Sequence, residues 1–195
     1  DFDEMIKNNE LDAVFLCSPS HLHCDQIEKA LEAGLHVFSE KPLGTTLEEC
    51  KRAEKAIENH PDKVFMLGFM RRYDPSYVYA KKMIDEGKIG KPFLFRGYSQ
   101  DPESAIAGAI AYAGNSEGQF IDMAVHDIDL SRWLLDSEPI QTWGIGGCYK
   151  HDEFGKHRDG DNVSALLKFK NDAMAFIFAG RTAPHGYNVE TEIIG

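Results

Sequence analysis

The first 72 residues alternate short apolar runs with stretches of helical periodicity, and this alternation restricts the chain to few folds. Between the runs, Cys24, Ile27 and Leu31 recur at spacings of three and four, and Thr46-x-x-Glu49 forms a capping box ahead of a second helical stripe. A β-α-β-α-β order requires right-handed crossovers and a parallel sheet. The strand-like runs cover residues 13–17, 35–39 and 64–69.

Polar residues follow each of these three runs. Because the carboxyl ends of parallel strands share one edge of a sheet, where ligands bind, we expect these residues to lie together. Lys41, held between Glu40 and a proline, is the strongest candidate for site chemistry. The alternative is a solvated turn, since loops are usually exposed. The three segments are Ser18-Pro19-Ser20-His21, Glu40-Lys41-Pro42 and Met70-Arg71-Arg72.

The pattern changes after a helix that Asp74-Pro75 begins and Gly87 closes. Further strand-like runs, rich in β-branched and aromatic residues, predict an α+β domain with a largely antiparallel sheet. We therefore expect two domains, residues 1–74 and 75–195, with a functional loop over 101–118 and one helix around 120–135. The runs cover residues 93–99, 141–148, 162–169, 173–178 and 188–194, and Asn171-Asp172 suits a tight turn between two of them.

The predicted helix carries Asp122 and His126, four residues apart. Such positions share one helix face, so the two side chains can act at one site, while Asp127 points elsewhere. A carboxylate beside a histidine can orient the ring and stabilise its protonated form, as a general base requires. A structural ion pair is the alternative.

Composition excludes several kinds of partner. The 21 basic and 32 acidic residues give a net charge of -11, which disfavours nucleic acid. No apolar run approaches the roughly 20 residues that cross a bilayer, so we expect no membrane partner. The cysteines lack a Cys-x-x-Cys pair and are predicted to be reduced core thiols of a cytoplasmic protein. We expect no metal, because the His21-x-His23-Cys24 cluster lacks a second cluster at zinc-like spacing.

Four motifs in this order resemble the Gfo/Idh/MocA oxidoreductases over nearly the whole chain. The resemblance is strongest to the inositol 2-dehydrogenase branch, through residues 68–74, His185-Gly186-Tyr187 and residues 190–195. It implies that residues 1–74 are the C-terminal part of a Rossmann-type dinucleotide-binding domain. The motifs are Ser-Pro-x-x-x-His from Ser18, Ser-Glu-Lys-Pro-Leu-Gly from Ser39, Gly-Phe-x-Arg-Arg-Tyr-Asp-Pro from Gly68, and Asp-x-x-x-His-Asp from Asp122.

The resemblance also implies roles for individual residues in an NAD-dependent dehydrogenase of a polyol or sugar. His126 would be the base, Lys41 would bind the substrate and the nicotinamide ribose, and Asp122 would bind a neighbouring hydroxyl and tune His126. The expected cofactor-lining residues are Ser18, Pro19, His21, Glu40 and Lys41. The expected substrate-side residues are Met70, Arg71, Asp122, His126 and Tyr187.

Two departures from the family pattern limit these expectations. The Gly-x-Gly-x-x-Gly turn and the acidic residue that reads the ribose do not occur, so we expect an internal fragment, and NADP stays an alternative to NAD. The segment Ser99-Gln100-Asp101-Pro102 stands where the inositol branch tends to carry His and Asn, which leaves the polyol open.

Two other functions remain open: a non-catalytic relative that binds nicotinamide dinucleotide or a sugar as a regulator, and a metal-dependent hydrolase built on His21, His23, Asp122 and His126. We further expect Pro42 to fix the direction of Lys41, through a cis Lys41-Pro42 bond. A homo-oligomer, a tetramer or dimer, is expected because the sheet of the second domain needs a cover.

Overall fold

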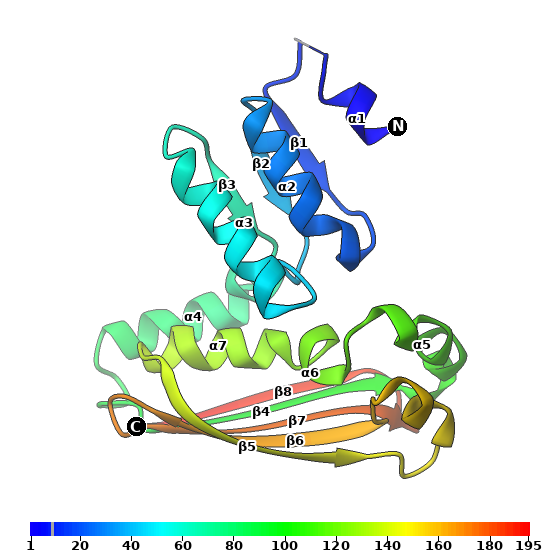
Figure 1. Cartoon of the computed structure of the whole chain (residues 1–195). Helices are drawn as coiled ribbons and strands as arrows, with labels where there is room; N and C mark the ends of the chain where they lie inside the picture. The colour runs from blue at the N-terminus through cyan, green and yellow to red at the C-terminus, as the bar shows by residue number, and fades with distance from the viewer. Residues whose placement is uncertain (9) are drawn as a thin grey trace. The chain divides into compact units, whose positions relative to one another are not determined.

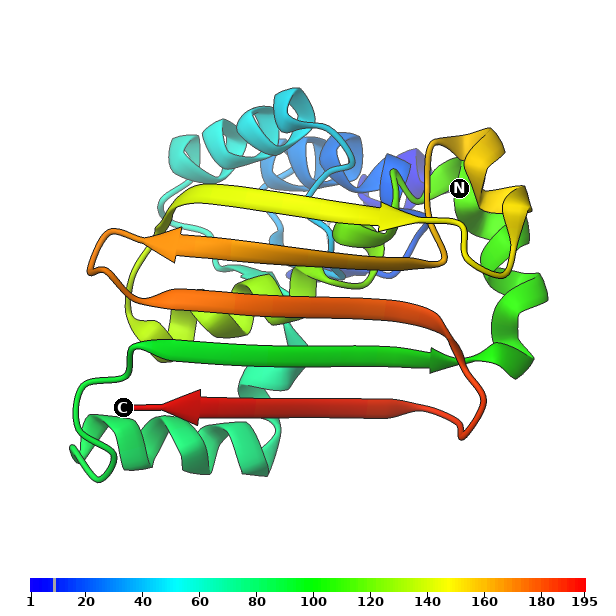
Figure 2. The same ribbon diagram turned by 90° about the horizontal axis from the view of Figure 1, so that it is seen from below.

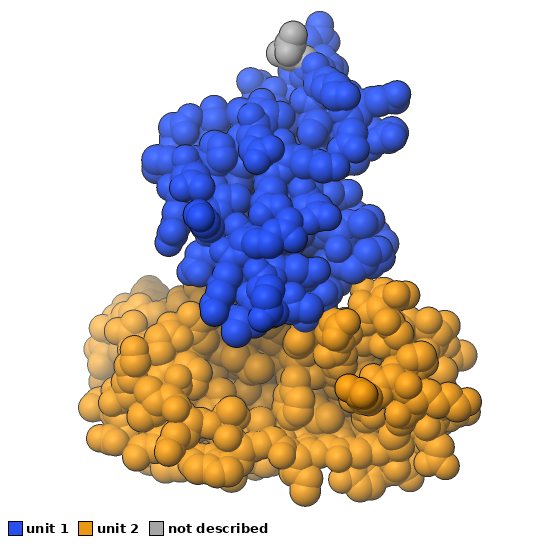
Figure 3. Space-filling model, in the orientation of Figure 1, with its two compact units in different colours: residues 1–69 blue, residues 70–195 orange. Residues whose placement is uncertain are grey.

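A computed structural model describes residues 1–8 and 10–195 of the chain. The chain forms two compact units, Asp1–Phe69 and Met70–Gly195, which Figure 3 colours separately. The helix α4 (Pro75–Asp85), expected from Asp74-Pro75 and Gly87, belongs to the second unit. No helix in the described ranges combines the length and apolar character that crossing a bilayer requires.

The first unit is a parallel sheet with helices, as predicted (Figure 1). The strands pair in the order β1-β2-β3, with Leu16 beside Ser39 and Ser39 beside Leu67. Short apolar strands joined by amphipathic helices leave only this parallel arrangement. Its elements are α1 (Phe2–Met5), β1 (Ala13–Leu16), η1 (Ser20–Leu22), α2 (His23–Glu32), β2 (His36–Ser39), α3 (Leu47–Asn59) and β3 (Phe65–Leu67).

Local sequence signals define the two longer helices of this unit. Thr46 accepts a hydrogen bond from the Glu49 amide, and the Glu49 carboxylate accepts one from the Thr46 amide, which confirms the capping box of α3. After α2, Gly34 adopts a φ of +78°, a conformation that favours glycine. Helix α2 buries Ile27 and Leu31 against β1 and β2.

The second unit is a five-stranded sheet in the order β5-β6-β7-β4-β8, seen face-on in Figure 2. Every neighbouring pair is antiparallel except β4 and β7, which run parallel, so the expectation of a largely antiparallel sheet is confirmed. The expected turn at Asn171-Asp172 joins β6 to β7. The strands are β4 (Leu94–Pro102), β5 (Pro139–Gly147), β6 (Asn162–Phe169), β7 (Met174–Ala183) and β8 (Asn188–Ile194).

One face of this sheet carries the core of the unit. Helix α7 (Val125–Leu135) places Leu130 and Leu134 in the apolar cluster that Phe95 of β4 and Ile177 of β7 share. In Figure 1, α4 and α7 lie over the same face of the sheet. The opposite face carries no helix in the described residues (Figure 2).

The expected loop over 101–118 is wrong, because much of this segment is helical. It contains η3 (Glu103–Ala105), α5 (Ile106–Tyr112) and η4 (Ala113–Asn115). Alternating alanines, the strongest helix formers, outweigh the three glycines of the segment. The remaining short helices are η2 (Met70–Tyr73), α6 (Gln119–Asp122) and η5 (Asp152–His157).

The expectation that all four cysteines are core thiols is also wrong. All four are free, but only Cys24 is buried, while Cys17 is exposed and Cys50 and Cys148 are half-buried. Cys17 directly follows β1, in which exposed residues alternate with buried ones, and it continues the exposed side of Ala13 and Phe15.

Asp161 organises the turn after β5. Its buried carboxylate accepts hydrogen bonds from the backbone amides of Tyr149, Lys150 and His151 and from the Asn162 side chain. Burial alone would raise the pKa of Asp161, but these hydrogen bonds outweigh it and lower the pKa below its ordinary 3.8.

We therefore expect Asp161→Asn to destabilise the protein by about 1.5 to 3 kcal/mol at neutral pH, the scale of hydrogen bonds to a charged group. Because the folded-state pKa is depressed, this stability is present above the ordinary pKa and is lost as pH falls through the folded pKa. Urea unfolding from pH 7 downward should show the two proteins converging in acid. A constant difference at every pH would contradict this assignment.

Candidate active site

The carboxyl ends of β1, β2 and β3 meet at one edge of the first unit. Leu16, Ser39 and Leu67 are successive neighbours across the sheet. The expectation of a shared edge is therefore confirmed. The cofactor-lining candidates Ser18, Pro19, His21, Glu40 and Lys41 all follow the ends of β1 and β2, on this edge.

His23, which the sequence analysis considered only as a metal ligand, bonds to two of the edge segments. Its Nε2 lies 2.8 Å from the carbonyl oxygen of Ser18, and its Nδ1 lies 2.7 Å from that of Pro42. The ring is buried at the start of α2. The Ser-Pro-x-x-x-His motif contains this histidine and could have identified it. Since each ring nitrogen of His23 lies against a backbone carbonyl oxygen, neither nitrogen is directed at a space where a metal could bind, which weighs against the hydrolase alternative.

The backbone around Lys41 is fixed on both sides. The Lys41-Pro42 bond is cis, which confirms that expectation. The Glu40 amide donates to the Leu16 carbonyl at 2.9 Å, and the Pro42 carbonyl is held by His23. The Lys41 side chain therefore starts from a well-defined backbone position.

The end of β3 also packs closely on this edge. A Cβ atom at Gly68 would lie 3.0 Å from the Phe38 ring and 3.2 Å from the Ser39 carbonyl oxygen. These distances are shorter than ordinary van der Waals contacts. Only glycine lets the β3 backbone lie this close to the end of β2 without displacing it.

An acidic cluster near α2 has its own counter-ion. Cys24, Asp25 and Glu28 could place three ligand atoms within 4.8 Å of one another. The Arg52 guanidinium donates to both carboxylates, at 2.8 Å to Asp25 and at 3.2 Å from Nε to Glu28. Arg52 therefore supplies the positive charge that balances the two carboxylates of this cluster.

In the second unit, Asp122 and His126 belong to two helices and not to the one expected. Asp122 is the last residue of α6, and His126 lies in the first turn of α7. Met123, with φ -113° and ψ -55°, departs from helical geometry between them. Their spacing of four residues therefore does not place them on one continuous helix face.

Asp122 forms an ion pair that the sequence did not suggest. Its Oδ2 accepts a hydrogen bond from Nη2 of Arg181 at 3.1 Å. Arg181 lies near the end of β7, beyond the run that sequence patterning assigned to a strand. The contact joins residues far apart in the chain, so no local pattern could have revealed it.

Arg71 is held in a buried polar network. Its Nη1 donates to Oδ1 of Asp127 at 3.0 Å, and its Nη2 donates to the Ser99 hydroxyl at 2.9 Å. Ser99 in turn donates to Oδ2 of Asp127 at 2.5 Å. Burial raises the pKa of Asp127, although Arg71 and Ser99 oppose that shift.

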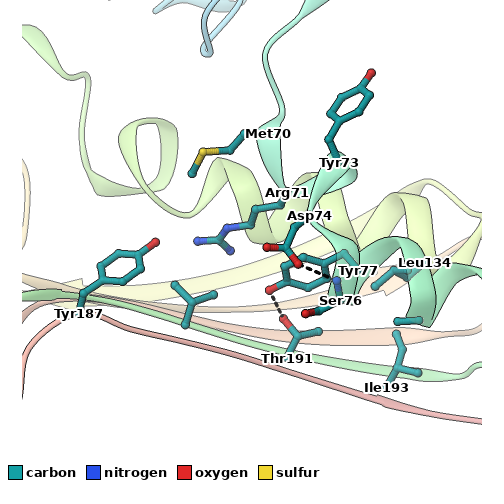
Figure 4. Close-up of a pocket in the computed structure, with 12 residues that line it drawn as sticks. Met70, Arg71, Tyr73, Asp74, Ser76, Tyr77, Leu134, Tyr187, Thr191 and Ile193 are labelled. Carbon is teal, nitrogen blue, oxygen red and sulfur yellow. Dashed lines mark hydrogen bonds between the residues drawn. The ribbon is translucent and has the colours of Figure 1, made fainter.

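A cavity of about 700 Å³ in the second unit brings together three of the substrate-side candidates. Figure 4 shows Met70 and Tyr187 on opposite sides of it, with Arg71 between them. Its floor includes Tyr77 of α4, whose hydroxyl is 2.9 Å from that of Thr191 on β8. Within the described residues, Asp122 and His126 are not among those that line it.

The fold and these motifs are those of a class of oxidoreductases that contain an NAD-binding Rossmann domain. The family description "Oxidoreductase family, NAD-binding Rossmann fold" matches residues 1–69. The description "GFO/IDH/MocA C-terminal domain" matches residues 77–195. The chain belongs to the Gfo/Idh/MocA family.

Similar proteins include two from Bacillus subtilis (strain 168). The chain is 35% identical to "Uncharacterized oxidoreductase YrbE" over 100% of its length and 56% of that protein. It is 36% identical to "scyllo-inositol 2-dehydrogenase (NAD(+))" over 98% of its length and 55% of that protein. The chain thus spans about half the length of the curated relatives it matches.

A solved structure provides a close structural match. The scyllo-inositol dehydrogenase from Lactobacillus casei, with bound cofactor NAD(H) and scyllo-inositol, is 46% identical and superposes with a TM-score of 0.93. The match covers 100% of this chain and 58% of that one.

Proposed function

We propose that the full-length protein oxidises a secondary hydroxyl of inositol or a related polyol or sugar to the ketone, by hydride transfer to NAD, with NADP as the alternative acceptor. The observation that carries this proposal is that a chain of this family carries Lys41, Asp122 and His126 in the motifs quoted above. Relatives named for inositol oxidation support the substrate class.

The three residue types suit the reaction. NAD, when bound, accepts the hydride at its nicotinamide ring. The hydroxyl proton must leave at the same time, and the His126 imidazole is a base near neutral pH that can take it. The Lys41 ammonium would donate to the reacting oxygen, and the Asp122 carboxylate would bind a neighbouring hydroxyl and favour the protonated form of His126.

The described edge of the first unit suits one end of the cofactor. The residues that would line it are Ser18, Pro19, His21, Glu40 and Lys41. They lie on two backbone segments, and His23 bonds to a carbonyl of each, at Ser18 and at Pro42. The lack of a side chain at Gly68 lets the end of β3 pack against Phe38 and Ser39 and so helps to fix the backbone of this edge.

The substrate side would be lined by Met70, Arg71 and Tyr187, which meet at the cavity of Figure 4. The Tyr187 ring is largely exposed, so its hydroxyl is accessible to a ligand. Arg71 would contribute mainly by fixing the wall, since two of its nitrogens are already bonded to Asp127 and Ser99.

The proposal is tested by incubating the full-length protein with myo-inositol, scyllo-inositol and simple sugars, with NAD and with NADP, and following formation of the reduced cofactor. Turnover of at least one polyol is expected. Tight cofactor binding without turnover of any of them would instead identify the non-catalytic regulatory relative.

Lys41→Ala should lower kcat by about 10-fold to 100-fold, because a hydrogen bond from a charged donor to the reacting oxygen is lost. Steady-state kinetics at saturating cofactor measure the effect. Lys55→Ala, a charge removal on the exposed part of α3, is the matched control. If Lys41→Ala changes only KM, Lys41 is an ordinary ground-state contact and not a catalytic group.

The proposal includes a homo-oligomer, a dimer or tetramer, formed through the helix-free face of the five-stranded sheet (Figure 2). Trp143, Ile145 and Leu166 lie on neighbouring strands of this face, with exposed fractions of 59%, 72% and 52%. Phe176 of β7 continues the row beside Leu166. A contiguous apolar patch of this kind marks an interaction surface, and a second copy offers the same patch.

Leu166→Asp should therefore reduce the mass of the full-length protein in analytical ultracentrifugation, because it places a charge in the apolar contact. Tyr79→Asp, at an exposed aromatic of α4, should leave the mass unchanged. A wild-type monomer at micromolar concentration would rule out the oligomer.

A further inference from the structure

Arg181 is a buried cation that the proposed chemistry does not yet use. It follows Ile177 and Ala179 on the face of β7 that the helices cover, and only 2% of its surface is exposed. A charge in such a position is costly unless it is paired and hydrogen-bonded. Its partners therefore indicate what the position is for.

The first partner, Asp159, forms a closed pair with Arg181. Nη1 of Arg181 donates to Oδ2 of Asp159 at 2.7 Å. The other carboxylate oxygen of Asp159 accepts from the backbone amides of Gln119 and Gly160, both at 2.8 Å. The Phe154 ring lies 4.9 Å from the guanidinium carbon. This pair already balances the buried positive charge and fixes the guanidinium plane.

The second partner, Asp122, differs in its surroundings. Its side chain is 30% exposed, whereas that of Asp159 is 2% exposed. It receives Nη2 of Arg181 at 3.1 Å. The four-residue helix α6 that ends at Asp122 is too short to hold a side chain rigidly by its own hydrogen bonds.

We propose that Arg181 is a positioning residue for the polyol oxidation. Anchored by Asp159, its guanidinium fixes the direction of the Asp122 carboxylate at the end of α6, and thereby the geometry in which Asp122 meets the substrate hydroxyl and assists His126. This inference rests on the proposed function. In this arrangement Asp159 anchors the Arg181 guanidinium, and Asp122 is the carboxylate that the guanidinium orients toward the substrate.

Arg181→Lys is the decisive variant. Lysine keeps one positive charge for the buried Asp159 but lacks the planar fork that reaches two carboxylates in fixed directions. Complete removal of the charge would leave Asp159 unpaired in the interior and could unfold the protein. We expect kcat to fall by about 10-fold to 100-fold, the effect of losing one hydrogen bond between charged groups. Affinity for NADH should match that of the control, and the protein should stay folded at the assay temperature.

The matched control is Arg72→Lys. Arg72 binds Asp129 through two nitrogens, at 2.8 and 2.7 Å, and lies over the Trp133 ring. Arg72 is thus a paired and stacked arginine of the same unit. The partners named for it are Asp129 and Trp133, and not Asp122. Its side chain is 37% exposed, against 3% for Arg181, so its replacement should cost less stability and should leave kcat near the wild-type value.

A double-mutant cycle with Asp122→Asn separates positioning from general support. If Arg181 acts through Asp122, Arg181→Lys should change kcat little once Asp122→Asn is present. Independent, additive losses would overturn the inference, as would a kcat for Arg181→Lys equal to that of the control. If the wild-type protein oxidises no polyol, the proposed function itself fails. If the wild-type protein oxidises a polyol but the losses in the cycle are additive, only the role of Arg181 is disproved.

Discussion

His126→Ala should lower kcat for polyol oxidation by about 10²-fold to 10⁴-fold, the usual contribution of a positioned general base. His126 lies in the first turn of α7, a helix that packs into the core through Leu130 and Leu134. The substitution is not expected to disturb that core. Steady-state kinetics of the full-length protein, with NADH affinity measured separately, provide the test.

His157→Ala is the matched control for this experiment, because His157 is an exposed histidine of η5. It should keep wild-type kcat. A His126→Ala protein that retained wild-type turnover would show that another group takes the proton. A loss of NADH affinity alone would place His126 in cofactor binding.

Asp127→Ala should destabilise the protein by about 3 to 5 kcal/mol, the cost of leaving one partner of a buried ion pair without the other. Asp127 is fully buried, and its two oxygens receive Arg71 and Ser99. Without it, the Arg71 guanidinium loses its charge partner in the interior. Urea unfolding, followed by tryptophan fluorescence, measures the loss.

Ser99→Ala gives the graded comparison, because it removes one neutral hydroxyl from the same network and should cost less. Gly97→Ala is an independent probe, since a Cβ atom there would lie 2.8 Å from Oδ1 of Asp127. It should also destabilise the protein by displacing the carboxylate. If Asp127→Ala left the free energy of unfolding unchanged, the Arg71 guanidinium would have other partners for its charge and hydrogen bonds.

Local signals predicted much of the fold. The capping box at Thr46 and Glu49, the proline after Asp74 and the glycine at 34 each set an element boundary through the backbone hydrogen bonds or φ angles of a few adjacent residues. The shared edge near Lys41 also followed, because parallel pairing is dictated by the order of strands and helices alone.

Features that depend on distant partners could not be predicted in this way. His23 bonds to two carbonyls of separate loops, and Arg181 pairs with carboxylates on two other segments. Likewise, no proline or glycine in the sequence marks the break at Met123 between α6 and α7. Each is decided by packing in the folded chain and not by the residues adjacent to it.

The parallel pairing of β4 with β7 constrains how the second unit can fold. Leu94 of β4 lies between Met174 and Ile194, so β4 separates two strands that are consecutive in the chain. It cannot pair with a neighbour in the sheet before β7 has been synthesised, and it gains its second neighbour only with β8. Contacts at such long sequence separation make sheet formation slow, because distant segments must meet first. During synthesis, β4 is therefore the strand that stays without its sheet neighbours for longest. It is also the strand that most needs protection from pairing with a wrong partner.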